Sequence, residues 1–183
     1  DQSLTFYTGA YHLIGGGGKL RRLPLPESVD LAGFYAGRIL FTLRDAWEVA
    51  GRTFPEGALL AIDAAAFRES GELPSIETVY TPDDRTSIEG VTVSRSGLYV
   101  SLLQNVKGSI LRFGVEAKSG EWRAEPLPLP PSGTVSLSAA NPHSGTVFVN
   151  YEDHITPDRL SEYDAGANAL TRLKALPARF RAD

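Results

Sequence analysis

The chain has 183 residues, which suits one ordinary domain or two very small ones. Hydrophobic residues make up 42% and charged residues 22%, a composition that excludes a disordered chain. The 18 basic and 22 acidic residues are mixed along the sequence and give a net charge of −4, so the basic surface expected of a nucleic-acid-binding protein is missing. The apolar runs are all far shorter than the roughly 18 residues of a membrane span, and we expect no membrane partner.

The chain contains neither cysteine nor methionine and begins with Asp1. The lack of cysteine excludes disulfides, thiolate metal sites and cysteine nucleophiles. Because an open reading frame starts with methionine, we expect a processed chain or a piece of a longer one. No targeting segment is recognised, so the compartment stays open between the cytoplasm and the periplasm.

The predicted elements are almost all strands, because apolar residues come in runs of four to eight bounded by Gly, Pro, Asn or Asp. The first two strands are 4–7 and 19–23. The one predicted helix is 63–70, with Asp63 as its N-cap and Gly71 just past its end. In chain order, the remaining predicted strands are 29–35, 38–44, 58–63 and 76–81, then 88–94, 98–103, 109–115 and 121–129, then 134–139, 146–151, 159–164 and 170–176.

These strands repeat in sets of four. Gly37, Gly97 and Gly145 each precede the second strand of a set, at spacings of 60 and 48 residues. The first set is longer because it contains the predicted helix and an insert, 47–56. Four-stranded units of about 40–50 residues indicate the blades of a β-propeller.

The predicted fold class is therefore all-β, a partial, open β-propeller of about three to four four-stranded antiparallel blades. The predicted domain organisation is a partial blade at 1–26, blades at 27–85, 86–131 and 132–178, and the start of a linker at 179–183. Three and a half blades are too few for a ring, which closes with about four to eight. We expect a fragment of a larger propeller that self-associates through its uncovered end faces.

The glycine run 15–18 before Lys19 is the first candidate for a functional motif. A phosphate-binding loop needs Ser or Thr after the lysine and a helix behind it. Leu20 follows instead and the next segment reads as a strand, so the sequence predicts a hairpin loop. A G-x-S-x-G nucleophile elbow does not occur in the sequence.

The three histidines, His12, His143 and His154, lie in different units or strands without a repeated metal-ligand spacing. The cluster 152–154, Glu-Asp-His, could in principle bind a metal, but a solvated loop is the better interpretation. We therefore assign no catalytic residue, no cofactor-binding residue, no metal ligand and no cofactor.

The remaining conspicuous residues are interpreted structurally. Trp47 and Trp122 are expected to anchor the core or the contacts between blades. The charged pairs 21–22 and 44–45 and the segment 179–181 are expected to face solvent on strands or edges.

The third unit resembles the last propeller blade of the prolyl oligopeptidase family of serine peptidases. Thr156 and Pro157 fit the loop of that blade, and Tyr163 and Asp164 fit the end of its next strand. The segment 170–177 is similar to the family's last propeller strand. Upstream, 39–47 and 57–63 look like the penultimate blades of bacterial members.

The resemblance implies a parent enzyme that hydrolyses peptide bonds in short peptides, often after proline. The family's Ser, Asp and His lie in an α/β-hydrolase domain, so none of them is carried onto this sequence. The implied partners are that hydrolase domain in the same parent chain and short peptide substrates. The propeller would cap the active site, with 29–35, 88–94 and 134–139 lining its channel.

Two other functions remain open. One is a non-catalytic β-propeller binding or scaffold module, with protein partners docking on loops such as 45–57. The other, a lactonase-type propeller hydrolase, ranks last because no carboxylate-rich cluster recurs at the strand ends.

Overall fold

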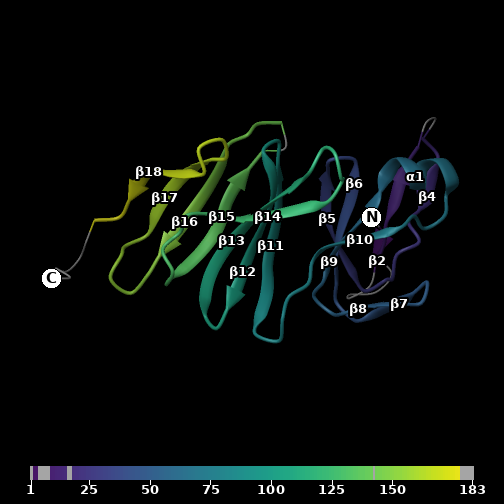
Figure 1. The fold of residues 1–183 in the computed structure, drawn as a ribbon, viewed down its shortest axis with the longest axis horizontal. Helices are drawn as coiled ribbons and strands as arrows, with labels where there is room; N and C mark the ends of the chain where they lie inside the picture. Colours follow the sequence, from purple (N-terminus) through teal and green to yellow (C-terminus); the bar gives the residue numbers. More distant parts are fainter. Residues whose placement is uncertain (1, 4–8, 16–17, 142, 178–183) are drawn as a thin grey trace. The chain divides into compact units, whose positions relative to one another are not determined.

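The computed structural model describes residues 2–3, 9–15, 18–141 and 143–177. The chain divides into two compact units, Asp1–Pro82 and Asp83–Asp183 (Figure 1). Antiparallel strands dominate both units, which confirms the all-β prediction of a partial propeller. Within the described ranges, no helix has the length and apolar character needed to cross a membrane.

The first unit is built on a four-stranded antiparallel sheet in the spatial order β10-β9-β6-β5. Its two middle strands are almost continuously apolar and buried, because both of their faces are covered. All four strands coincide with predicted ones to within one residue at each end. They are β5 (Val29–Tyr35), β6 (Arg38–Leu43), β9 (Leu59–Asp63) and β10 (Ile76–Tyr80).

The helix α1 (Ala64–Ser70) follows β9 directly and confirms the predicted caps. Asp63 Oδ1 accepts a hydrogen bond of 2.7 Å from the backbone N–H of the third helical residue. Gly71 has φ +76°, and its N–H donates to the Phe67 carbonyl. Arg21 is exposed as expected, and its guanidinium also donates to the carbonyl oxygens of Phe67 and Arg68, at 3.3 and 2.7 Å. This arginine therefore satisfies carbonyl groups at the end of the helix.

A small hairpin fills the predicted insert between β6 and β9. It consists of β7 (Trp47–Val49) and β8 (Arg52–Phe54). The Trp47 ring packs on Phe41 and Phe54, with centroid distances of 6.2 and 6.1 Å, and Phe54 is buried. The prediction that Trp47 anchors the core is confirmed.

The N-terminal region adds two more pairs of short strands. β1 (Gln2–Ser3) pairs with β2 (Gly9–Ala10), and β3 (His12–Ile14) pairs with β4 (Leu20–Arg22). The predicted strand 4–7 lies outside the described residues, whereas 19–23 contains β4.

The second unit holds two four-stranded meanders, each ordered as in the sequence. The strands match the predicted ones, except that the predicted strand 121–129 is shorter and ends at Pro126. The first meander is β11 (Thr86–Ser94), β12 (Gly97–Gln104), β13 (Lys107–Val115) and β14 (Trp122–Pro126). The second is β15 (Thr134–Ala140), β16 (Val147–Glu152), β17 (Arg159–Asp164) and β18 (Ala169–Ala175).

The same irregularity recurs in the first strand of all three four-stranded sheets. The register with the second strand shifts by one residue at Ala32 in β5, at Glu89 in β11 and at Ser138 in β15. A bulge on an edge strand bends it and discourages pairing with a further strand. The repeat recognised in the sequence is therefore also a repeat of backbone geometry.

Aromatic packing joins the two meanders of the second unit. The rings of Tyr99, from β12, and Tyr163, from β17, meet edge to face with centroids 5.9 Å apart, and both are buried. Val147 and Val149 of β16 and Ile110 of β13 belong to the same core cluster.

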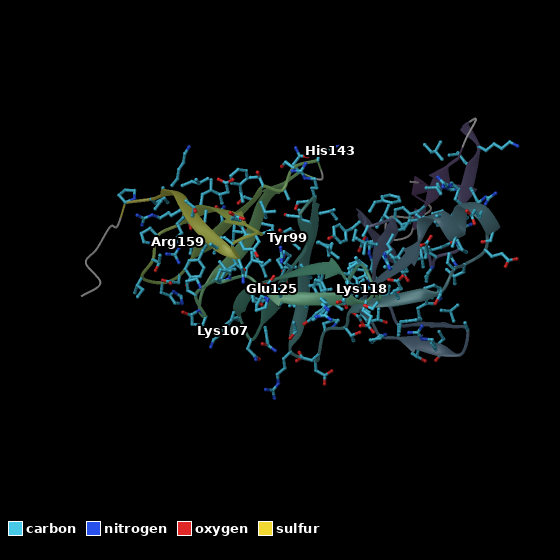
Figure 2. The ribbon with its side chains drawn as sticks, turned by 45° about the horizontal axis from the view of Figure 1, so that its top comes forward. Tyr99, Lys107, Lys118, Glu125, His143 and Arg159 are labelled. Atoms are coloured by element: carbon cyan, nitrogen blue, oxygen red, sulfur yellow. The ribbon has the colours of Figure 1, made fainter. Side chains whose placement is uncertain are left out.

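Hydrogen bonds also join the two meanders near this aromatic contact, and Figure 2 labels Tyr99 and Glu125 of this region. Arg112 of β13 donates to Glu125 Oε2 at 2.6 Å within its own meander, and to the Ala165 carbonyl of the next meander at 3.0 Å. Asn168 donates to Glu125 Oε1 at 3.3 Å and accepts a bond of 2.9 Å from the Tyr163 hydroxyl. We call these four side chains, Arg112, Glu125, Tyr163 and Asn168, the seam network.

Replacing Arg112 with Met should lower the free energy of unfolding by about 1–3 kcal/mol, because Glu125 and the Ala165 carbonyl lose their donor. Arg123→Met is the matched control. Arg123 forms an exposed ion pair with Glu116, so its loss should cost at most about 0.5 kcal/mol. Urea unfolding followed by circular dichroism measures both, and equal losses would show that Arg112 does not join the meanders.

Gly133→Ala should destabilise the second unit by about 2–4 kcal/mol. Gly133 has φ +132°, and a Cβ there would lie 2.5 Å from the Glu152 carbonyl oxygen and 2.8 Å from the Tyr151 hydroxyl. Gly114→Ala is the control, since a Cβ at Gly114 has no described atom within 4 Å. Urea unfolding should leave Gly114→Ala within about 1 kcal/mol of the parent. A Gly133→Ala protein as stable as the parent would contradict the close approach.

Candidate functional site

The three histidines lie on separate elements. His12 is in β3, His143 follows β15 in a turn where its backbone N–H donates to Asn141 Oδ1, and His154 is in the loop after β16. His143 and His154 flank opposite ends of β16, which spans roughly 20 Å. Within the second unit, the structure therefore does not bring His143 and His154 together into one site.

Gly15 and Gly18 of the glycine run lie between the paired strands β3 and β4. Ile14 pairs with Leu20, and the N–H of Gly15 donates to the Lys19 carbonyl at 2.9 Å. Gly16 and Gly17 lie outside the described residues. The hairpin prediction is confirmed, and no helix follows the lysine as a phosphate-binding loop requires.

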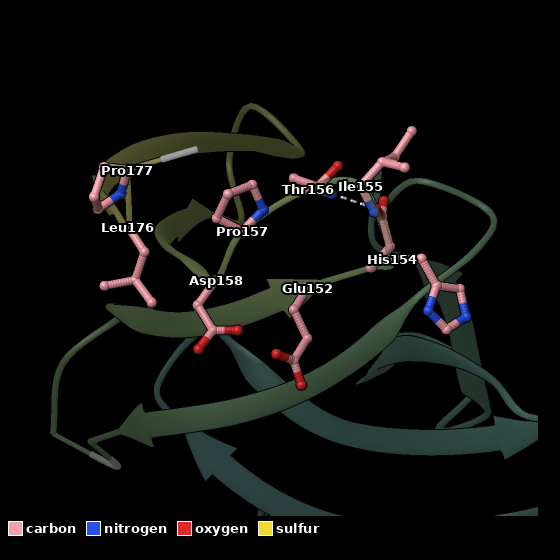
Figure 3. A pocket seen from close by; sticks show the side chains of 9 residues that line it. Glu152, His154, Ile155, Thr156, Pro157, Asp158, Leu176 and Pro177 are labelled. Carbon is pink, nitrogen blue, oxygen red and sulfur yellow. Dashed lines mark hydrogen bonds between the residues drawn. The ribbon is translucent and has the colours of Figure 1, made fainter. Parts of the chain in front are cut away.

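The loop between β16 and β17 forms a pocket with the chain that leaves β18 (Figure 3). Its volume is about 250 Å³. The wall combines apolar residues with carboxylates, and it contains the Thr-Pro motif of the sequence. The lining residues are Glu152, Asp153, His154, Ile155, Thr156, Pro157, Asp158, Leu176 and Pro177.

Asp153 holds this loop in shape. Its Oδ1 accepts hydrogen bonds from the N–H groups of Ile155 and Thr156, at 2.9 and 2.6 Å. Its Oδ2 accepts from the Tyr151 hydroxyl at 2.8 Å, and that hydroxyl also contacts the Ser132 carbonyl. The backbone hydrogen bond from Ile155, followed by that from Tyr151, lowers the pKa of Asp153 to about 2. The Asp153 carboxylate therefore stabilises the backbone of the loop.

Glu152 and Asp158 lie across the mouth of the pocket, at the end of β16 and just before β17. Figure 3 shows their carboxyl groups next to each other, with His154 apart from them. The pKa of Glu152 is raised above its ordinary value, first because its protonated carboxyl donates a hydrogen bond to Asp158, and second because the negative charge of Asp158 repels a charge on Glu152. Sequence reasoning singled out 152–154 and missed this pair, since Asp158 lies six residues further along.

The side chains of residues 152–154 do not point toward a common site. Asp153 is held by the loop backbone, whereas Glu152 meets Asp158. Among the described residues, no group of three His, Asp or Glu side chains could hold a metal ion. What the pocket offers chemically is an apolar wall with a carboxylate pair at its rim.

Among the described residues, two further hollows are formed, one in each unit. The first lies beside β5, has a volume of about 350 Å³ and includes His12. The second, about 460 Å³, lies beside the seam network and includes Ser96 and Tyr163. Ser96 Oγ donates to the Gly145 carbonyl at 2.9 Å and meets the Tyr99 hydroxyl, so this serine is engaged in structure.

Antiparallel four-stranded meanders that repeat along the chain define a β-propeller protein, of which this chain forms a part. Residues 47–175 match the family described as prolyl oligopeptidase, N-terminal beta-propeller domain. The chain belongs to this family, and the resemblance drawn from the third unit is confirmed.

Relatives agree with this assignment. The uncharacterized peptidase y4nA of Sinorhizobium fredii is 30% identical over 162 residues, which cover 87% of this chain and 22% of that protein. The solved structure of a post-proline cleaving enzyme from Rickettsia typhi shares the fold with a TM-score of 0.80 at 16% identity, over 97% of this chain and 26% of the other. Oligopeptidase B from Leishmania major matches at 14% identity with a TM-score of 0.63, over 94% and 24%. The chain thus spans about a fifth to a quarter of the length of these proteins.

The Asp153 carboxyl should titrate with a midpoint of about pH 2. Because the pKa is lowered in the folded loop, the stabilisation is complete above about pH 4 and is lost as the pH falls through 2. A ¹³C titration of the carboxyl groups measures this, and the amides of Ile155 and Thr156 should shift with the same midpoint. Asp153→Asn should remove the transition, and an ordinary midpoint near 3.8 would contradict the hydrogen-bond assignment.

Proposed function

We propose that this chain is part of the non-catalytic propeller of a serine oligopeptidase and restricts access of short peptides to an α/β-hydrolase domain of the same polypeptide. The observation that carries the proposal is the family match over residues 47–175, together with the repeated blades. Named relatives with this fold include a post-proline cleaving enzyme and an oligopeptidase.

Size selection follows from the geometry of propeller blades. Blades stand around a central channel. The first strands, β5, β11 and β15, each lie at one edge of their sheet and carry a bulge, and we place them at the channel. An extended peptide is about 10 Å across. Even a 100-residue folded domain has a radius of gyration of about 13 Å, so a narrow channel admits the first and rejects the second.

The chemistry is assigned to residues outside this chain. Hydrolysis through a serine needs a nucleophile, a histidine base and an acid that orients the base. The sequence has no nucleophile elbow, and its described histidines lie on separate elements. The role proposed for this chain is therefore steric.

The division into blades belongs to the same proposal. We place a partial blade at 1–26, blades at 27–85, 86–131 and 132–178, and the start of a linker to the hydrolase domain at 179–183. The three four-stranded sheets each fall within one of these blades.

A scaffold module that binds partners through 45–57 finds less support. In that segment Trp47 and Phe54 pack into the core of their own unit, so its large apolar side chains are engaged within the chain.

Steric restriction predicts that loosening the propeller relaxes the size limit. In the complete polypeptide, Gly133→Ala should raise kcat/KM for a 40-residue peptide relative to a five-residue proline-containing peptide, and Gly114→Ala should leave the ratio unchanged. This chain alone should cleave neither peptide. Hydrogen exchange of the Gly133→Ala protein, which should be faster in the second unit than in the parent, measures the loosening.

Two outcomes separate the parts of the proposal. An unchanged ratio in a loosened Gly133→Ala protein would show that the propeller does not select by size. If the gene for the complete polypeptide encodes no G-x-S-x-G motif followed by Asp and His, the proposal that the polypeptide is a serine peptidase is wrong.

A further inference from the structure

The pocket beside the β16–β17 loop exposes large apolar side chains. Ile155 is 66% exposed and Leu176 is 56% exposed, and Pro157 and Pro177 line the space between the two segments (Figure 3). Apolar side chains gathered around a hollow on a loop surface indicate a contact with another molecule more strongly than scattered ones do.

The rim of the pocket carries negative charge for which the described residues offer no counterion. Glu152 and Asp158 are both exposed, and neither forms an ion pair with any residue in the ranges that the structure describes. The adjacent Arg159 forms no ion pair with either carboxylate. Its guanidinium packs instead on the Tyr151 ring, 4.5 Å from the ring centroid. A cation placed between the two carboxylates would relieve their repulsion and gain charge-assisted hydrogen bonds.

The walls of the pocket are preformed. Asp153 fixes one side through the N–H groups of Ile155 and Thr156. The N–H of Leu176 donates to the Asp158 carbonyl at 2.9 Å and fixes the other side. A ligand would therefore lose little affinity to the ordering of the loop.

We propose that this pocket docks a segment of a partner protein in which an arginine adjoins a leucine-sized apolar residue. The guanidinium binds between Glu152 and Asp158, and the apolar side chain enters the hollow lined by Ile155, Pro157 and Leu176. Arginine fits better than lysine because its planar group donates to two carboxylates at once. This interaction surface contains no residue of β5, β11 or β15, the strands placed at the channel, and it does not depend on the proposed peptidase function.

A small cation is a poorer occupant of the same rim. Calcium takes six to eight oxygen ligands, and among the described residues no group of three His, Asp or Glu side chains could hold a metal ion. A metal would also leave the exposed apolar wall uncovered.

The test is an NMR titration of the ¹⁵N-labelled chain with acetyl-leucyl-arginine amide. The matched probe is acetyl-leucyl-citrulline amide, which has nearly the same shape without the charge. We expect saturable shifts at Ile155 and Leu176 with the arginine probe and at least tenfold weaker binding of the citrulline probe. The exposed variants Glu152→Gln and Asp158→Asn should each weaken the arginine probe at least fivefold, whereas Asp84→Asn should leave it unchanged.

Several results would overturn the proposal. Equal binding of both probes would show that the carboxylates do not recognise the cation. Displacement of the probe by millimolar calcium, with shifts of the same amides by calcium alone, would make the rim a metal site. Tenfold tighter probe binding in a chain that ends at Pro177 would show that the chain's own Arg179 or Arg181 competes for the rim. Dimerisation that Glu152→Gln abolishes in sedimentation would identify a second copy as the occupant.

Discussion

The burial of the middle strands on both faces is the constraint on which the rest of the structure depends. Ile39, Leu40 and Phe41 are consecutive in β6 and fully buried, as are Leu98, Tyr99 and Val100 in β12. Successive side chains of a strand point to opposite faces, so a single four-stranded sheet with such strands leaves apolar surface in water on whichever face is uncovered. The blades built around β6 and β12 therefore require packing on both faces, which is the physical reason that propeller blades occur in series.

Within the second unit this requirement is met by an apolar seam closed with polar contacts. The Tyr99–Tyr163 contact belongs to the apolar core of the seam. Arg112, Glu125 and Asn168 add hydrogen bonds between the two meanders, and these require a particular geometry. Apolar packing alone tolerates sliding, whereas hydrogen bonds fix one register between neighbouring meanders. The edge strands and the loops at the strand ends are then left to contact other molecules, because the middle strands are buried in the packing of the blades.

Elements that depend on local pattern could be predicted from the sequence. The helix after Asp63 and the strand sets around Gly37, Gly97 and Gly145 follow from capping residues and alternating apolar runs. The β7–β8 hairpin was missed, since strands of three residues carry too little periodicity. The predicted strand 121–129 was too long because the apolar and proline-rich residues after Pro126 lie outside the ladder. The recurring bulges could not be predicted, because they exist only as a relation between two strands.

The sequence by itself determined the class of fold, the four-strand repeat and the absence of a nucleophile elbow, because each of these is a property of neighbouring residues or of spacing. Only the tertiary structure decided what nonlocal side chains do. It placed Arg21 at the end of a helix more than forty residues away, and it set Asp158 against Glu152 at the rim of one pocket. Such pairings arise when strands and loops fold against one another, so they have no signature in the order of the residues.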